Sequence, residues 1–228
     1  MIHRRRHIPR RRAGLLPGLV AALMLLAAAP AAGQTTGGAE AVIGGLDVRP
    51  ASLAERTLRI AGNVGPEHAG RTVRVDRQKP DGTWEPIASA TADQNGAFAA
   101  AWLTDEPGRY ALRATPVRAD GTAAAASATE LIARVSVFAP AIASWYGPRF
   151  FGRKTACGIR LTRRTLGVAH KKLPCGTKVE IYHRNRTIVV PVIDRGPFIA
   201  GRQWDLTQAA AEQIGLRATE RVGVLPAA

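Results

Sequence analysis

The sequence predicts a mainly β fold with two domains, an antiparallel β-sandwich followed by a barrel. Between residues 53 and 137, short stretches of alternating apolar and polar residues are separated by turn-forming pairs, as in strands joined by hairpins. Residues 187–193 are an almost unbroken β-branched run, which suits a strand buried in a closed barrel. The length of 228 residues, with 46% hydrophobic and 21% charged residues, fits a globular protein of one or two domains.

Residues 1–33 have the three-part plan of a secretory signal peptide. Six arginines and no acidic residue precede an apolar run from Leu15 to Ala29, and small residues follow it. The run is shorter than the roughly 20 apolar residues that a membrane span usually needs. We therefore expect a cleaved signal, a secreted or cell-envelope protein and no stable membrane span after processing; a retained anchor is the alternative.

The net charge of +15 would by itself indicate nucleic acid as a partner. Its distribution argues otherwise, because residues 34–135 carry 11 basic and 12 acidic side chains whereas residues 136–228 carry 15 and 5. The basic excess of the mature chain thus belongs to the C-terminal domain of an exported protein, and we expect no nucleic-acid partner.

Residues 34–52 are rich in Gly, Ala and Thr without periodicity, which predicts a linker. The β-sandwich is expected over residues 53–137. Its strands are indicated at residues 57–60, 72–76 and 110–114, and its turns at Asp81-Gly82, Asn95-Gly96, Pro107-Gly108 and Asp120-Gly121. Four aromatic residues are expected in its core or on its sheet faces rather than on a ligand platform: Trp84, Phe98, Trp102 and Tyr110.

The second domain is expected over residues 138–228, after a short apolar hinge at residues 138–141. Strands are predicted at residues 179–182 and 187–193. A short helix then begins with Asp205 as its N-cap, since Gln208 stands three residues further on, and it ends at Gly215.

Cys157 and Cys175 are the two cysteines of the sequence. In an exported protein a disulfide between them is the simplest expectation. Closing a loop of about 19 residues contributes roughly 3 kcal/mol in the chain-entropy model. The alternative is a free catalytic thiol.

Six motifs follow one another between residues 142 and 216: ASWYGP at 143–148, TACG at 155–158, LGVAHK at 166–171, LPCGTKV at 173–179, VIDRGPF at 192–198 and DLT at 205–207. In this order they resemble the rare lipoprotein A (RlpA) family, and the two cysteines resemble its disulfide-bearing branch. The resemblance implies a six-stranded double-psi β-barrel with short helices, shared with expansins and barwin-like domains. It also implies lytic transglycosylase activity on peptidoglycan glycan strands. The preceding sandwich resembles the immunoglobulin-like modules of secreted bacterial proteins in general pattern, which implies a spacer or adhesion role.

Asp194 is the expected catalytic acid/base. It ends a buried strand immediately before a turn, where burial would raise its pKa and contact with Arg195 would lower it. The alternative is a turn carboxylate bonded to backbone amides. The resemblance implies that His170 lies in the same groove and acts as the partner of Asp194.

The expected substrate-binding residues are Trp145, Tyr146, Thr155 and Arg195. An aromatic face can pack on the apolar face of a pyranose, so Trp145 and Tyr146 suit the walls of a sugar groove, with a place in the barrel core as the alternative. No cofactor is expected. No metal is expected either, because the histidines and Asp194 lack ligand-like spacing.

The sequence departs from the resemblance at Ile159, where enzymatic family members commonly carry Glu. A glycosidase mechanism with two carboxylates would then need another acid, for which Glu180 and Asp205 are the nearby candidates. A lytic transglycosylase can work with one acid/base, because the hydroxyl of muramic acid itself closes the 1,6-anhydro ring.

The sequence therefore leaves three functions open. The first is cleavage of the MurNAc–GlcNAc bond by a lytic transglycosylase. The second is a non-catalytic, expansin-like wall-binding or wall-loosening module, held to anionic wall polymers by its basic charge. A barrel that binds another protein through its basic face is a third, supported by the charge alone.

Overall fold

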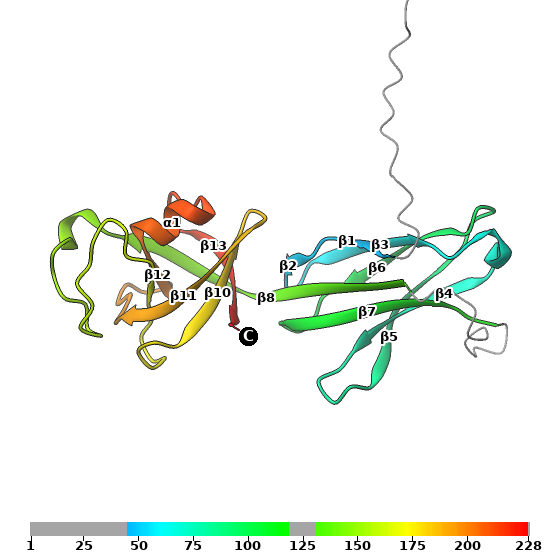
Figure 1. Ribbon diagram of the computed structural model, residues 1–228, viewed down its shortest axis with the longest axis horizontal. Coiled ribbons are helices and arrows are strands. Elements are labelled where there is room, and N and C mark those ends of the chain that lie inside the picture. The colour runs from blue at the N-terminus through cyan, green and yellow to red at the C-terminus, as the bar shows by residue number, and fades with distance from the viewer. Residues whose placement is uncertain (1–44, 119–130, 228) are drawn as a thin grey trace, which may run out of the picture. The chain divides into compact units, whose positions relative to one another are not determined.

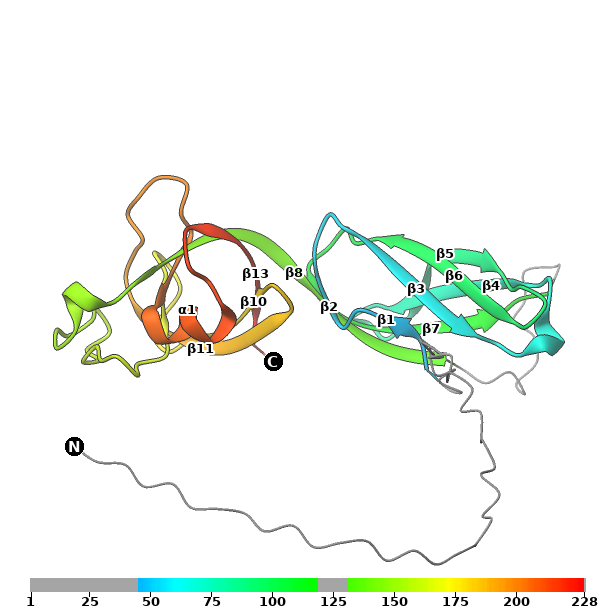
Figure 2. The ribbon, with the colours of Figure 1, turned by 90° about the horizontal axis from the view of Figure 1, so that it is seen from above.

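The computed structural model describes residues 45–118 and 131–227, which form a mainly β protein with few helices (Figure 1, Figure 2). The signal peptide expected at residues 1–33, residues 34–44 of the expected linker and the turn at Asp120-Gly121 lie outside these ranges. Within the described ranges, no helix has the length and apolar character needed to cross a membrane.

The N-terminal part contains two sheets. One has the order β1-β3-β6, formed by β1 (Asp47–Val48), β3 (Thr57–Asn63) and β6 (Ala97–Leu103). The other contains β2 (Ala51–Leu53), β4 (Thr72–Gln78), β5 (Trp84–Thr91), β7 (Gly108–Pro116) and the first half of β8 (Leu131–Tyr146). A 3₁₀ turn, η1 (Pro66–His68), precedes β4. The three predicted strands are confirmed within β3, β4 and β7.

The end of the expected linker takes part in these sheets. β1 pairs with β3, and β2 pairs in parallel with β8 at residues 136–138. Residues 47–48 and 51–53 are therefore strands rather than linker, because backbone pairing with strands far along the chain orders a segment that lacks any local periodicity.

Side chains from both sheets share one core. Its members include Ile60, Val73, Val75, Phe98, Trp102, Leu112 and Val137. The expectation for the four aromatic residues is confirmed: Phe98, Trp102 and Tyr110 are buried, and Trp84 is half-buried on the sheet beneath the guanidinium of Arg113, 4.3 Å from its ring centroid. The immunoglobulin-like topology of this module stays a prediction.

The C-terminal part is a closed six-stranded barrel. Its strands are the second half of β8, β9 (Val168–Ala169), β10 (Lys178–His183), β11 (Arg186–Asp194), β12 (Trp204–Thr207) and β13 (Glu220–Pro226). They pair in the cycle β8-β13-β10-β11-β9-β12, and β12 closes on β8. The predicted strands at residues 179–182 and 187–193 are confirmed within β10 and β11. Apolar side chains of these strands fill the interior, among them Ile181, Val190, Val192 and Leu206.

The expected hinge at residues 138–141 is part of strand β8, which continues to Tyr146. Pro140 is tolerated there because it pairs with Gly223 of β13 in the interval where β8 has left β7 and has not yet met β12. A proline without an N–H fits such an edge-like position. Strand β8 thus crosses the expected domain boundary at 137/138, and the boundary stays a prediction.

The helix α1 (Gln208–Ile214) follows β12 directly and ends at Gly215, as predicted, with a left-handed φ of 72°. The prediction of Asp205 as its N-cap is wrong. Pairing with β8 keeps residues 204–207 extended, so Thr207 is the cap, and its hydroxyl accepts a hydrogen bond from the N–H of Ala210 at 3.4 Å. A second 3₁₀ turn, η2 (Pro148–Phe150), follows β8.

Candidate active site

Asp194 and Asp205 lie in one row across the barrel wall. Asp194 stands opposite Ala169 in the β11–β9 pair, and Ala169 stands opposite Asp205 in the β9–β12 pair. Asp205 in turn stands opposite Ser144 of β8. Residues at one level of adjacent strands share a face, and two strand spacings amount to about 10 Å between main chains. We call Asp194 and Asp205 the acidic pair.

A β-bulge turns Asp194 toward this face. The pairing of β11 with β9 shifts register between Val192 and Asp194. In a regular strand these two residues would share a face, and Val192 is fully buried in the barrel core. The irregularity instead directs Asp194 to the face of Asp205, in keeping with the general property of bulges to redirect a side chain.

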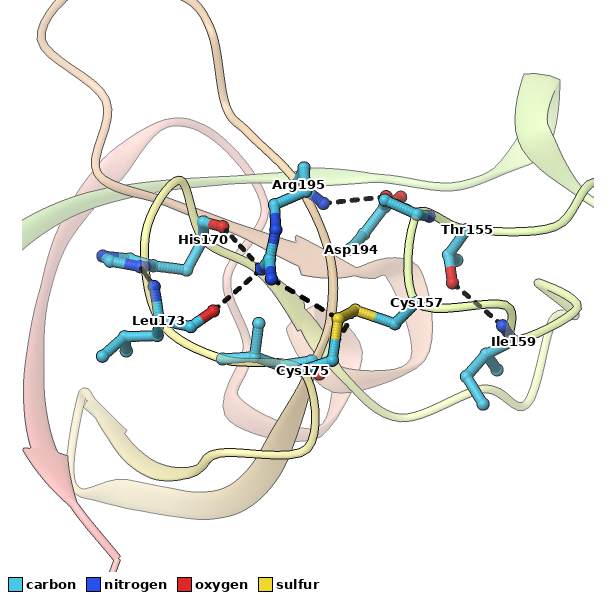
Figure 3. The surroundings of a disulfide bond; sticks show 10 residues. Thr155, Cys157, Ile159, His170, Leu173, Cys175, Asp194 and Arg195 are labelled. Carbon is cyan, nitrogen blue, oxygen red and sulfur yellow. Dashed lines mark hydrogen bonds between the residues drawn. A yellow bond between two sulfur atoms is a disulfide. The ribbon is translucent and has the colours of Figure 1, made fainter.

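The Asp194 carboxylate is held by backbone amides. Its Oδ1 accepts hydrogen bonds from the N–H of Ala156 at 2.9 Å and from that of Arg195 at 2.8 Å, and Figure 3 shows the Arg195 bond. This is the contact pattern of a turn carboxylate, the alternative that the sequence left open. The two bonds fix the orientation of a half-buried acid beside the barrel rim.

Asp205 has the more perturbed environment of the two acids. Its Oδ1 accepts a hydrogen bond from Ser144 Oγ at 2.8 Å. Burial raises the pKa of Asp205 and the negative charge of Asp194 adds to the rise, while the Ser144 bond and the charge of Arg202 oppose it. Asp205 therefore keeps its proton to a higher pH than an ordinary aspartate, which suits a general acid.

Tyr146 joins the acidic pair on the same face. It lies two residues beyond Ser144 on β8, so both side chains point to one side of the strand. Its hydroxyl is buried without a hydrogen-bond partner in the described part of the chain. Burial raises the pKa of Tyr146, and the negative charges of Asp194 and Asp205 raise it further. The hydroxyl thus lies within electrostatic reach of both acids.

The imidazole of His170 does not face Asp194. Its Nδ1 accepts hydrogen bonds from the N–H groups of Lys172, at 3.2 Å, and Leu173, at 2.9 Å, and its ring packs on Trp204 at 4.4 Å between centroids. Figure 3 shows the ring directed away from the Asp194 carboxylate. Burial lowers the pKa of His170, as do the positive charges nearby, which favours the neutral ring. Because Nδ1 accepts two backbone hydrogen bonds, the proton of the neutral ring is on Nε2.

Trp145 and Tyr146 lie on opposite faces of β8, because they are consecutive residues of one strand. The Trp145 indole N–H donates to the carbonyl of Arg217 at 3.2 Å. The ring borders a cavity of about 300 Å³ beside α1. Of the two expected groove walls, the structure brings only Tyr146 to the acidic pair.

Arg195 and Thr155 are engaged in holding the loops at the rim. The Arg195 guanidinium donates to the carbonyls of Leu173, at 2.8 Å, and His170, at 3.3 Å, and lies 3.5 Å from Cys175 Sγ (Figure 3). Thr155 Oγ1 accepts a hydrogen bond from the N–H of Ile159 at 3.2 Å. Both side chains shape the loops around Asp194, and their contact with substrate stays a prediction.

The predicted disulfide is confirmed, with Cys157 Sγ and Cys175 Sγ 2.01 Å apart. The alternative of a free catalytic thiol is therefore wrong. The bridge joins the turn that carries Ala156, a donor to Asp194, to the loop that Arg195 holds (Figure 3). It is thus part of the frame that positions the carboxylate.

The rim around the acidic pair is basic. Between Pro148 and Lys172 the sequence has eight Lys and Arg and no Asp or Glu. Ile159 lies in this segment with 45% of its surface exposed, so the turn presents an apolar side chain where the resemblance implies an acid. No group of three or more potential metal ligands occurs within residues 45–118 and 131–227.

The spacing between Asp205 and Gln208 predicted a helix cap at Asp205, whereas the structure places this residue in the acidic pair. The signal that could have found it is the alternation WDLT at residues 204–207. Trp204 and Leu206 are buried in the core, which directs Asp205 to the opposite face of the strand.

Known proteins resemble the barrel. A family model described as lytic transglycolase matches residues 139–227. A probable endolytic peptidoglycan transglycosylase RlpA from Aquifex aeolicus is 46% identical over 86 residues, which cover 37% of each protein. An endolytic peptidoglycan transglycosylase RlpA from Campylobacter jejuni is 44% identical over 90 residues, covering 39% of this chain and 33% of that protein.

Among solved structures, the Streptomyces papain inhibitor shares 26% identity over 37% of this chain and 91% of its own, with a TM-score of 0.29. The matched region spans about a third of the length of these two RlpA relatives, 37% and 33% respectively. Residues 139–227 therefore form an RlpA-like double-psi β-barrel domain.

Proposed function

We propose that this protein is exported and acts on peptidoglycan glycan strands in the cell envelope as a lytic transglycosylase, cleaving the MurNAc–GlcNAc bond with a 1,6-anhydro product. The observation that carries the proposal is the environment of Asp205, a carboxyl with a raised pKa beside a second acid and a buried tyrosine. The names of the similar RlpA proteins support the same reaction and substrate.

In this proposal Asp205 is the proton donor. Its carboxyl protonates the bridging oxygen as the bond from that oxygen to C1 of MurNAc breaks, so the leaving sugar departs as an alcohol. The negative charge of Asp194, which Ala156 and Arg195 hold in place, stabilises the positive charge that develops on the sugar ring. The acetamido group of MurNAc can share in this stabilisation.

The second half of the reaction returns the proton. The C6 hydroxyl of MurNAc attacks C1 and closes the 1,6-anhydro ring, and its proton passes to the Asp205 carboxylate, which restores the acid. One acid/base thus serves both halves, and the reaction proceeds without a carboxylate at Ile159. A glycosidase that inserts water would need a second catalytic carboxylate.

The remaining residues have supporting roles in this proposal. His170 and Arg195 position Asp194 through the loop at residues 170–175, and Tyr146 lies within electrostatic reach of both acids. The basic rim attracts the carboxylates of wall polymers before binding. The N-terminal sandwich is a spacer or adhesion module.

The test compares the oxidised mature protein with its Asp205→Asn and Asp194→Asn variants on purified peptidoglycan and on peptide-stripped strands, scored by mass spectrometry for 1,6-anhydro ends. We expect the parent to form such ends and Asp205→Asn to form them at least about 100-fold more slowly, as for loss of a general acid. Asp194→Asn should also be slower. Asp81→Asn, an exposed sandwich residue, is the matched control and should equal the parent.

The exposed Ile159 favours a second candidate, a non-catalytic module that binds or loosens the wall. Anhydro ends absent from the parent and every variant, with pelleting on the wall retained, would establish this candidate. Formation of anhydro ends by Asp205→Asn at the parental rate, with loss in Asp194→Asn, would instead make Asp194 the acid/base.

A further inference from the structure

A second site candidate lies on the face of β8 opposite Tyr146. Here Trp145 borders a cavity of about 300 Å³, whose other lining residues belong to the start of β11, to helix α1 and to the segment after it. We call it the Trp145 pocket. Its lining residues include Trp145, Arg186, Gln208, Glu212, Leu216 and Arg217. Because successive strand residues point to opposite faces, the pocket and the acidic pair lie on different sides of β8.

The indole of Trp145 presents a fixed, exposed surface to this pocket. Its N–H is bonded to the Arg217 carbonyl, which defines the orientation of the ring, and 37% of the residue remains exposed. Trp102 and Trp204, by contrast, are buried in the two cores. A held and exposed aromatic face is the surface on which the apolar side of a pyranose packs.

The pocket has two arginines, Arg186 and Arg217, against one acid, Glu212, and this balance of charge suits an anionic sugar. Arg186 and Arg217 are exposed, and their planar guanidinium groups can bind a carboxylate through two parallel hydrogen bonds. Gln208 donates its amide N–H to Glu212 at 2.7 Å, while its Oε1 is buried without a partner in the described part of the chain. That oxygen is an acceptor for which residues 45–118 and 131–227 supply no donor.

We propose that the Trp145 pocket binds an N-acetylated sugar that bears a carboxylate, as a glycan site separate from the acidic pair. The sugar ring packs on Trp145, and its carboxylate pairs with Arg186 and Arg217. The inference rests on the proposed function for the identity of the polymer. It adds a second point of attachment, which holds a strand, or a neighbouring strand, while the acidic pair acts.

The experiment measures binding, so that it stands apart from catalysis. The Asp205→Asn protein, in which turnover is suppressed, is titrated with a GlcNAc–MurNAc tetrasaccharide, and the Trp145 indole N–H resonance is followed by NMR after assignment with Trp145→Phe. We expect this resonance to shift on saturation. Trp145→Ala and the exposed charge reversal Arg186→Glu should each raise the Kd for peptide-stripped strands at least tenfold in pelleting assays.

Arg221→Glu, an exposed residue of β13 outside the pocket with the same charge change, is the matched control and should bind like the parent. Chitotetraose, which has no carboxylate, should bind at least tenfold more weakly than the tetrasaccharide. If a free stem peptide shifts the Trp145 resonance equally well, the carboxylate that the pocket binds belongs to the peptide. This result would overturn the assignment of a sugar as the ligand.

Unchanged affinity in both Trp145→Ala and Arg186→Glu, or an unmoved indole resonance at saturation, would overturn the inference. Arg186→Glu keeps the test decisive if Trp145→Ala fails to fold. Failure of the proposed function has a different signature, namely the absence of anhydro ends from the parent protein, and it leaves these binding results interpretable.

Discussion

Asp76 of the sandwich and Asp205 of the barrel are both acids within β-strands, but their surroundings differ in kind. Asp76 is 1% exposed, and Arg74 and Arg113 donate to its two oxygens at distances from 2.9 to 3.3 Å. Asp205 accepts a hydrogen bond from the neutral Ser144 and lies in the field of a second acid, Asp194. One carboxylate is neutralised by cations, whereas the other is destabilised in its charged form.

This difference distinguishes an acid that stabilises the fold from an acid suited to catalysis. A carboxylate between two guanidinium groups has its charge matched and joins β4 to β7, so its removal should cost stability. A carboxylate with a raised pKa is less stable when ionised, so its removal should cost activity. We therefore expect Asp→Asn to reduce mainly stability at Asp76 of the sandwich and mainly activity at Asp205 of the barrel.

The largest expected effect on stability comes from removing the disulfide, which lies in the barrel. We expect Cys157→Ser/Cys175→Ser to lower the free energy of unfolding of the barrel by roughly 3 kcal/mol. The sandwich core should keep its stability, since the bridge lies in the barrel. Hydrogen exchange resolved along the chain measures both. Equal loss of protection in both parts would show that the sandwich depends on the bridge as much as the barrel does, which contradicts the prediction.

Asp76→Asn should lower the free energy of unfolding by about 2 kcal/mol, less than for a fully buried pair because Arg74 and Arg113 are themselves partly exposed. Anhydro-product formation per folded molecule should not change. Urea unfolding and the mass-spectrometric assay test the two statements. A loss of activity without a loss of stability would mean that Asp76 has a chemical role rather than a structural one.

Asp205→Asn should show a pH-dependent gain in stability over the parent. The folded-state pKa of Asp205 lies above the ordinary value of 3.8, so the parent loses stability as pH rises through the window between the unfolded and folded pKa values. The variant has no such group. The difference between variant and parent should therefore grow from pH 3 toward neutrality in urea titrations, and a difference that is constant with pH would refute the raised pKa.

The smallest effect is expected for Tyr146→Phe. Its hydroxyl has no hydrogen-bond partner among the described residues, so removal should change the free energy of unfolding by less than about 1 kcal/mol. Formation of anhydro ends should fall as well if the hydroxyl contacts the substrate. Urea unfolding checks the first statement, and a loss above about 2 kcal/mol would mean that the hydroxyl is bonded to one of the acids in the free protein.

The sequence alone determined the features that depend on near neighbours. Alternation of apolar residues located β3, β4 and β7, the β-branched run located β11, and Gly215 marked the end of α1. The count of two cysteines, in a chain that the sequence predicts to be exported, was enough to predict the disulfide. Each of these follows from a local periodicity, a turn preference or a count, none of which requires knowing which strands meet.

The tertiary structure alone decided which side chains share the site. Asp205 is part of strand β12, which pairs with β8, and therefore belongs to the acidic pair instead of capping α1 as the sequence predicted. The bulge before Asp194 directs that side chain to the same face. The His170 ring was directed away from Asp194 by the turn that follows β9. The physical reason is that strand register and barrel closure are set by contacts between residues far apart in the chain, and a shift of one residue moves a side chain to the other face.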